Sequence, residues 1–156
     1  MIRVVVSACL LGAPVRYNGA DKKSHHPVLQ RWIDEGRVVS ACPEMLGGLG
    51  TPRPPAEIMP GTTRVVTPSG DDVTDAFHRG AQLTLEAANG IRVAVLKEGS
   101  PSCGSTYVYD ATFTSTRLPG EGITTQLLRS RGIAVFSEEQ LDAANAYVEE
   151  LERPHG

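Results

Sequence analysis

Apolar residues along the chain alternate between short β-branched runs and segments with helical spacing. The run at 2–6 is almost wholly apolar, which is typical of a buried strand of a parallel sheet. Similar runs predict three further strands, at 37–41, 91–96 and 133–136. Apolar positions spaced three or four apart predict four helices between and after them, from Pro27 to just before Gly36, and at 73–88, 123–130 and 141–151.

Strands that alternate with helices predict an α/β fold with a mostly parallel sheet. We expect a single domain over residues 1–156, folded as a Rossmann-like three-layer structure. The segment 46–70 is rich in Gly, Pro and Thr and is expected to be an ordered loop. Residues 106–120 are expected to be irregular or to hold a small strand pair. Ligands of such sheets bind beyond the carboxyl ends of the strands.

The sequence VVSAC occurs twice, ending at Cys9 and at Cys42. The two cysteines are 33 positions apart, which fits one βαβ unit of about 30 residues. The third cysteine, Cys103, stands in KEGSPSCGS after the strand at 91–96. Each cysteine therefore follows a predicted strand, and we expect all three at one edge of the sheet.

Composition fits an ordinary soluble globular protein. Of 156 residues, 40% are hydrophobic and 21% charged, and the formal net charge is −3. This charge gives no reason to expect binding to a membrane or to nucleic acid. Neither a signal peptide nor an apolar run of about 20 residues is recognisable. We therefore expect a cytoplasmic monomer or small homo-oligomer with free thiols, since three cysteines do not form a disulfide framework.

Three thiols at one edge leave several interpretations open. Each cysteine alone is compatible with a small buried hydrophobe. A zinc site would need a fourth ligand, for which His25 or His26 is available. An iron–sulfur cluster is a third interpretation, and with no fourth cysteine it would keep one iron open for a ligand.

Longer motifs favour the third interpretation. The segments VVSACLLGAPVRYNG, VVSACPEMLGGLGTPRPPAEI and VLKEGSPSCGS resemble, in this order, the DUF523 family, which includes the thiouracil desulfidases. The resemblance continues through DDVTDAFHRGAQ and IAVFSEEQ and so covers essentially the whole chain. One difference is Gly99, which stands where relatives often carry a larger residue.

The resemblance implies a [4Fe–4S] cluster held by Cys9, Cys42 and Cys103, with the iron that lacks a thiolate as the catalytic one. It also implies catalytic roles for Glu44 and Ser100. A carboxylate next to the cluster suits a general base for water, and a serine hydroxyl suits a hydrogen bond to the water or the substrate ring. The structural alternatives are a helix-start carboxylate for Glu44 and a turn or N-cap role for Ser100.

Other polar residues near these motifs are candidates for the substrate pocket. They are Ser7, Arg16, Tyr17, Asn18, Arg53 and Lys97. A phosphorylated substrate would favour Arg53 or the pair Lys22 and Lys23, although a solvated surface is the simpler reading of the two lysines.

The resemblance therefore predicts a non-redox desulfidase that acts on 2-thiouracil, 4-thiouracil or 4-thiouridine monophosphate. Its products would be the uracil compound and hydrogen sulfide. Intact nucleic acid is disfavoured as a substrate because the chain is mildly acidic. The alternative is a non-catalytic zinc or sulfur-carrier module, which would not need Glu44 and Ser100.

Overall fold

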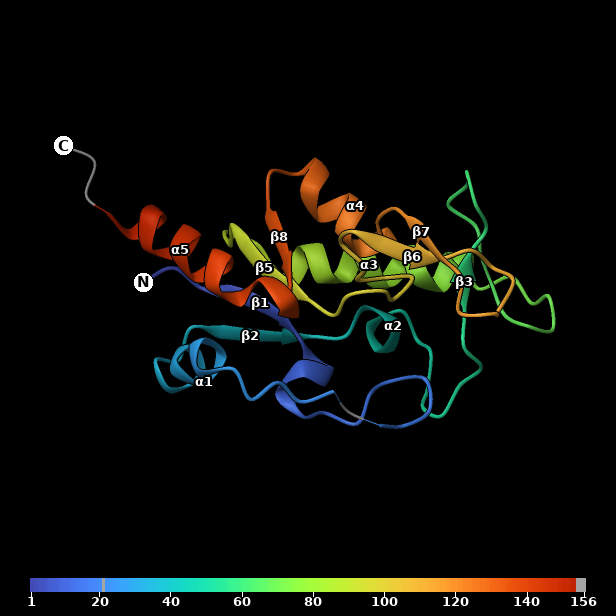
Figure 1. Cartoon of the computed structure of the whole chain (residues 1–156), viewed down its shortest axis with the longest axis horizontal. Helices are drawn as coiled ribbons and strands as arrows, with labels where there is room; N and C mark the ends of the chain where they lie inside the picture. The colour runs from blue at the N-terminus through green and yellow to red at the C-terminus, as the bar shows by residue number, and fades with distance from the viewer. Residues whose placement is uncertain (21, 154–156) are drawn as a thin grey trace.

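The central sheet has four parallel strands. The computed structural model describes residues 1–20 and 22–153 (Figure 1). The strands are β1 (Val4–Ser7), β2 (Val38–Ala41), β5 (Val93–Leu96) and β8 (Ala134–Ser137), and their order in the sheet is β2-β1-β5-β8. Val5 of β1 pairs with Val39 on one side and with Ala94 on the other. The four predicted strands and their parallel arrangement are confirmed.

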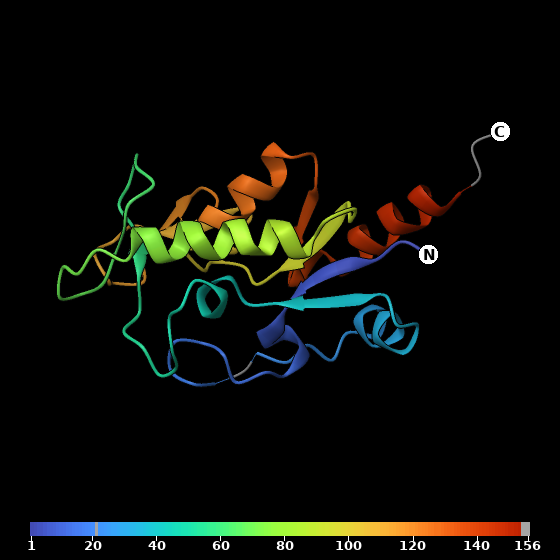
Figure 2. The same ribbon diagram turned by 180° about the vertical axis from the view of Figure 1, so that it is seen from behind.

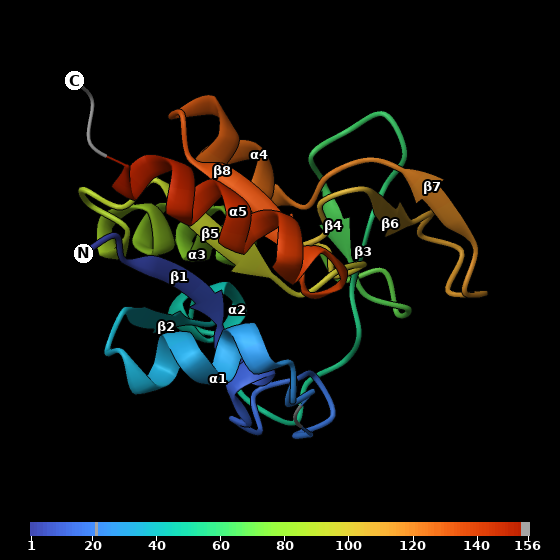
Figure 3. The same ribbon diagram turned by 60° about the vertical axis from the view of Figure 1, so that its left-hand side comes forward.

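Two layers of helices cover the sheet. One face packs against α1 (Pro27–Asp34) and α5 (Leu141–Glu152), and the other packs against α3 (Thr74–Ala87) and α4 (Ile123–Ser130). Figure 3 shows α5 in front of the sheet, and Figure 2 shows α3 across the opposite face. None of the helices in the described residues is long and apolar enough to span a membrane. The three-layer α/β architecture is therefore as predicted.

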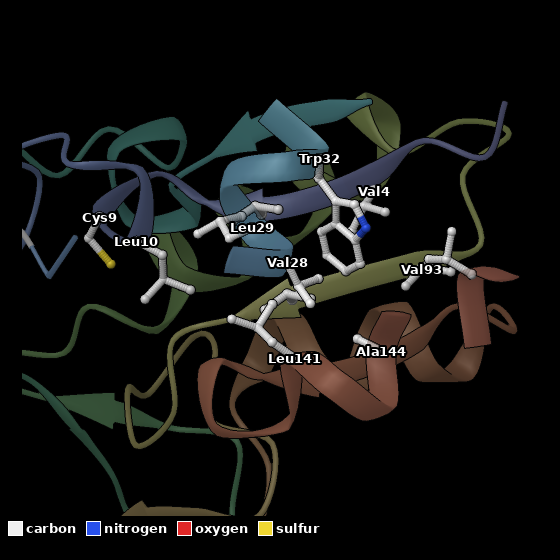
Figure 4. Packing of buried hydrophobic residues seen from close by; sticks show 12 residues of the cluster. Val4, Cys9, Leu10, Val28, Leu29, Trp32, Val93, Leu141 and Ala144 are labelled. Atoms are coloured by element: carbon white, nitrogen blue, oxygen red, sulfur yellow. The ribbon is translucent and has the colours of Figure 1, made fainter. Parts of the chain in front are cut away.

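Alternation of side chains along β1 divides the core in two. Val4 and Val6 point to the α1 and α5 layer, where Trp32 and Leu141 meet them (Figure 4). Val5 points the opposite way, into a second cluster that includes residues of α4 and the end of α3. A strand covered on both faces must be apolar at every position, which explains its continuous β-branched run.

Caps set the ends of the helices as the sequence indicates. Helix α1 starts at Pro27, with the Nδ1 atom of His26 accepting from the Val28 amide, and Gly36 follows it at φ +72°. The predicted capping box joins Ser137 and Gln140 in the 3-10 helix η2 (Glu138–Gln140) that leads into α5.

Short elements gather beyond the carboxyl ends of the sheet strands (Figure 1). They are the 3-10 helix η1 (Ala8–Leu11), the single-turn helix α2 (Pro43–Leu46), and two antiparallel pairs, β3 (Glu57–Ile58) with β4 (Val65–Val66) and β6 (Tyr107–Tyr109) with β7 (Arg117–Pro119). The first pair lies within the predicted ordered loop, and the second is the predicted small pair. Together they surround the site.

Candidate functional site

A cavity of about 350 Å³ lies at this end of the sheet. Its lining includes all three cysteines together with Glu44 and Ser100. Five of the six predicted pocket residues also line it: Ser7, Arg16, Tyr17, Arg53 and Lys97. Residues from distant parts of the chain therefore meet where the parallel topology places them.

The order of the strands brings the three cysteines together. Cys9 lies in η1 directly after β1, Cys42 is the N-cap of α2 after β2, and Cys103 lies in the turn after β5. Since β1 is hydrogen-bonded to both β2 and β5, the three following loops are neighbours. Ser7 at the end of β1 links this strand to the loop after β5, because its Oγ donates to Cys103 Sγ at 3.6 Å and accepts from the Lys97 amide at 2.9 Å.

All three thiols are free, and their environment disfavours the thiolate. Burial raises the pKa of Cys9 to about 11 and that of Cys103 to about 12. Burial also raises the pKa of Cys42. Thiols in such a setting stay protonated at neutral pH unless a bound cation stabilises the thiolates. The three thiols could therefore serve as metal ligands, but they would lose their protons only when a metal binds.

This donor set fits an iron–sulfur cluster better than a single ion. Among the described residues, no three His, Cys, Asp or Glu side chains surround one point closely enough to hold a metal ion. His26 is engaged elsewhere, with Nδ1 capping α1 and Nε2 at 3.5 Å from Asp142. His25 is exposed. In a cluster each thiolate binds a different iron, so three separated thiols on one cavity suit it.

Glu44 is held in place by two partners. It lies in the first turn of α2, and its Oε2 accepts a hydrogen bond from Ser102 Oγ at 3.1 Å. Its Oε1 lies 3.4 Å from Arg53 Nη2, and that nitrogen also donates to the Val15 carbonyl at 3.0 Å. The Nε atom of Arg53 is buried and has no hydrogen-bond partner among the described residues. The result is an oriented carboxylate with a guanidinium beside it at the cavity wall.

Ser100 has both a turn role and a link to Glu44. Its Oγ accepts from the amides of Ser102 and Cys103, at 3.1 and 2.8 Å, which stabilises the turn that carries the third thiol. The same Oγ lies 3.0 Å from Ser102 Oγ, so Ser100, Ser102 and Glu44 form a hydrogen-bonded row. Ser102 is fully buried and was missed by the sequence reasoning, although it stands in the same SPSCG motif.

Glu98 stabilises the base of the same turn, and no sequence pattern predicts this role. It is 4% exposed, and its carboxylate accepts hydrogen bonds from the amides and hydroxyls of Ser105 and Thr106. Burial alone would raise the pKa of Glu98, but hydrogen bonds from Thr106 and Ser105 outweigh this and lower the pKa to about 2. Glu138 supports the segment from outside by pairing with Lys97 at 2.9 Å.

Three predicted polar residues are not brought into the cavity. Asn18 is absent from its lining, and its Oδ1 accepts from the Ala20 amide at 3.0 Å in a local turn. The side chains of Lys22 and Lys23 are exposed and do not line it. Two tyrosines that were not predicted, Tyr107 and Tyr109, do line it.

Comparison with known proteins identifies a matching family model, a similar solved structure and a further relative. A family model described as 2-thiouracil desulfurase matches residues 4–140. The solved structure of the [4Fe–4S]-dependent thiouracil desulfidase TudS is 50% identical, covers 96% of this chain and 99% of that one, and superposes with a TM-score of 0.93. The uncharacterized protein YbbK of Bacillus subtilis (strain 168) is 43% identical over 149 residues, covering 89% of this chain and 97% of that protein.

Proposed function

This chain belongs to the 2-thiouracil desulfurase family, and on that premise we propose that it removes sulfur from thiolated uracil compounds with the help of a [4Fe–4S] cluster. One observation carries the proposal: three free thiols, a paired carboxylate and a serine line a single cavity. The compounds we propose are 2-thiouracil, 4-thiouracil and 4-thiouridine monophosphate, and the reducing cytoplasm is the setting that suits free thiols.

The proposed reaction is a hydrolysis and transfers no electrons. Water provides the oxygen of the new C=O bond, the C–S bond breaks, and the sulfur leaves with both water protons as hydrogen sulfide. The balance needs no external reductant, and the products are the uracil compound and sulfide.

Cys9, Cys42 and Cys103 are the residues that would hold the cluster, because each faces the cavity from a different loop. When bound, the cluster supplies an iron without a protein thiolate, which is a Lewis acid with an affinity for the soft thione sulfur. The rest of the reaction depends on side chains of this chain.

Glu44 is the proposed base that takes a proton from the attacking water. Arg53 and Ser102 hold the two carboxylate oxygens, so the group is oriented before the water arrives. Each oxygen keeps a free lone pair with which to accept the proton. Ser100, joined to Glu44 through Ser102, is placed to hydrogen-bond the water or the ring. Glu44 then returns the proton as the sulfur leaves.

The test is sulfide release by protein reconstituted without oxygen, with iron measured per chain. We expect release from 2-thiouracil or 4-thiouridine monophosphate in proportion to iron, at about four irons per chain. The matched control is Cys42→Ser, which keeps the size of the side chain and should lose both iron and release. A full iron content without release from any of the three compounds would refute the proposed substrates. A chain that binds no iron would refute the cluster.

A further inference from the structure

Tyrosines are concentrated at the cavity. Aromatic residues make up only 5% of the chain, which has four tyrosines. Tyr17, Tyr107 and Tyr109 line the cavity, and only Tyr147 lies elsewhere, packed against the core beside Phe136. The hydrophobic core is mostly aliphatic, and its fully buried aromatic side chains are Trp32 and Phe77. The aromatic rings at the cavity therefore call for an explanation other than core packing.

The hairpin of β6 and β7 holds two of these rings. Tyr107 and Tyr109 are two residues apart and so lie on one face of β6, while Val108 between them is buried in the core beneath. Their rings meet edge to face, with centroids 6.0 Å apart and planes at 82°. The guanidinium carbon of Arg117 on β7 lies 4.2 Å from the centre of the Tyr107 ring. These contacts hold Tyr107 in one orientation.

Gly99 lets the Tyr107 ring approach the cysteine turn. A Cβ atom at position 99 would lie 2.8 Å from Cε2 of Tyr107 and 3.2 Å from its Oη, so a side chain there would require the Tyr107 ring to move. The backbone of Gly99 also has φ +82°, which favours glycine. The next residue is Ser100. The absence of a side chain at 99 thus places an aromatic ring directly against the turn that carries Ser100 and Cys103.

We propose that Tyr107 determines specificity by packing against the flat conjugated ring of the substrate, with Tyr109 supporting it. The inference rests on the proposed function, since that function supplies a planar pyrimidine ring. Arg117 lies over one face of the Tyr107 ring, so the substrate would meet the other face. At the wall of a cavity of about 350 Å³, such a face selects for planarity because a puckered ring loses contact with it. The polar groups at the cavity would recognise the C=S group and its neighbours but not planarity.

The test compares two substrates that share the thioamide edge. 2-Thiouracil is planar, whereas 5,6-dihydro-2-thiouracil has the same edge on a puckered ring. We expect Tyr107→Leu to reduce the preference for the planar compound, measured as the ratio of kcat/KM values, by about ten- to a hundredfold relative to the native chain. Comparing the ratio between variants removes the difference in intrinsic reactivity of the compounds. Tyr107→Phe keeps the ring and should keep the preference.

A second readout does not depend on turnover. Calorimetry with uracil and 5,6-dihydrouracil should show preferential binding of uracil by the native chain and by Tyr107→Phe, and little preference by Tyr107→Leu. Iron content and the thermal midpoint should be measured for each variant. If Tyr107→Leu does not fold, Tyr107→Val, which suits a strand, replaces it.

The outcomes separate this inference from the proposed function. A native chain that releases sulfide while Tyr107→Leu keeps the full preference for planar rings overturns the inference and leaves the function standing. A native chain that releases no sulfide, yet loses its uracil preference in Tyr107→Leu, supports the inference and overturns the function. A native chain that does not bind uracil in preference to 5,6-dihydrouracil overturns the inference, while sulfide release alone decides the function.

Discussion

At the scale of single residues, Glu44 is the group whose replacement tests the chemistry most directly. Glu44→Gln keeps the size of the side chain and an acceptor for Ser102, but removes the base. We expect kcat to fall by about 10²- to 10⁴-fold, the usual contribution of a general base. Iron content should stay unchanged because no thiol is altered. The control is Glu86→Gln on the exposed side of α3, and equal activity of both variants would refute the role of Glu44.

Ser102 tests whether orientation of that carboxylate matters. Its buried hydroxyl donates to Glu44 and lies 3.5 Å from Cys103 Sγ. Ser102→Ala removes the hydrogen bond that orients Glu44, worth about 1–1.5 kcal/mol, so we expect kcat to fall about tenfold with iron retained. Ser130→Ala, which removes an exposed hydroxyl from α4, is the matched control. A Ser102→Ala variant with native kcat would make the hydrogen-bonded row structural only.

The cysteines, Glu44 and Ser100 could be predicted from the sequence, whereas Ser102 and Glu98 could not. The cysteines follow strands, so strand prediction alone placed them at one edge, and the family motifs identified Glu44 and Ser100. Ser102 meets Glu44 across 58 positions of chain, and no local pattern records such a contact. Glu98 had no signal either, because a carboxylate in a loop normally reads as a solvated charge.

At the scale of elements, the contact of α2 with α3 positions both Cys42 and Glu44. Glycines make this contact possible: a Cβ on Gly80 would lie 1.8 Å from the Pro43 carbonyl oxygen, and one on Gly47 would lie 2.0 Å from that of Ala76. Helix propensity alone would make Gly80→Ala stabilising by about 1 kcal/mol. The close approach of the two backbones reverses this expectation.

We therefore expect Gly80→Ala to lower stability and to displace α2 from its place. The urea midpoint should fall, and so should the iron content and the rate of sulfide release. Gln82→Ala, at an exposed position of the same helix, should leave both unchanged. A Gly80→Ala variant that is more stable than the native chain and retains full iron would show that α2 does not depend on this contact.

Glu98 stabilises a different element, the turn from 99 to 106. Glu98→Ala removes the acceptor of the buried Ser105 amide and hydroxyl and of the exposed Thr106, and we expect a loss of about 2–4 kcal/mol in the free energy of unfolding at pH 7. The pKa of Glu98 is lowered from 4.5 to about 2, so its contribution is complete above pH 4.5 and is lost as the pH falls toward 2. Urea midpoints of the two chains should therefore converge over that range. A gap that stays constant would contradict the role of the charge.

The main helices and the sheet strands were predicted almost to the residue, whereas several of the short elements around the site were not. Helix α4 occupies the predicted span, and α3 and the four sheet strands differ from prediction by only one or two residues. The single turn of α2 and the two-residue strands β3 and β4 are too short to carry a period, so only tertiary contacts define them. These short elements surround the site, and the sequence therefore did not predict the contacts that orient the side chains there.

At the scale of the whole molecule, the cluster would join three loops whose cysteines are 33 and 61 positions apart along the chain. The thiols are protonated without it, since burial raises their pKa values. Loading must therefore release protons from the thiols as well as from the incoming inorganic sulfide. After the sulfide contribution is subtracted, we expect close to one proton for each of the three cysteines at pH 7 in weakly buffered solution. A thiol contribution near zero would mean that the thiols already carry charge.

The same cross-link predicts where cluster removal loosens the fold. Hydrogen exchange of loaded and cluster-free protein should differ most in η1, α2 and the turn at 99–106, because those segments carry the three ligands. Helices α1 and α5 pack against the far part of the sheet around Trp32 and should exchange equally in both forms. This contrast follows from a sheet that folds on its own apolar core and presents the site at one end. Uniform loss of protection in both helices would instead show that the cluster is needed for the whole fold.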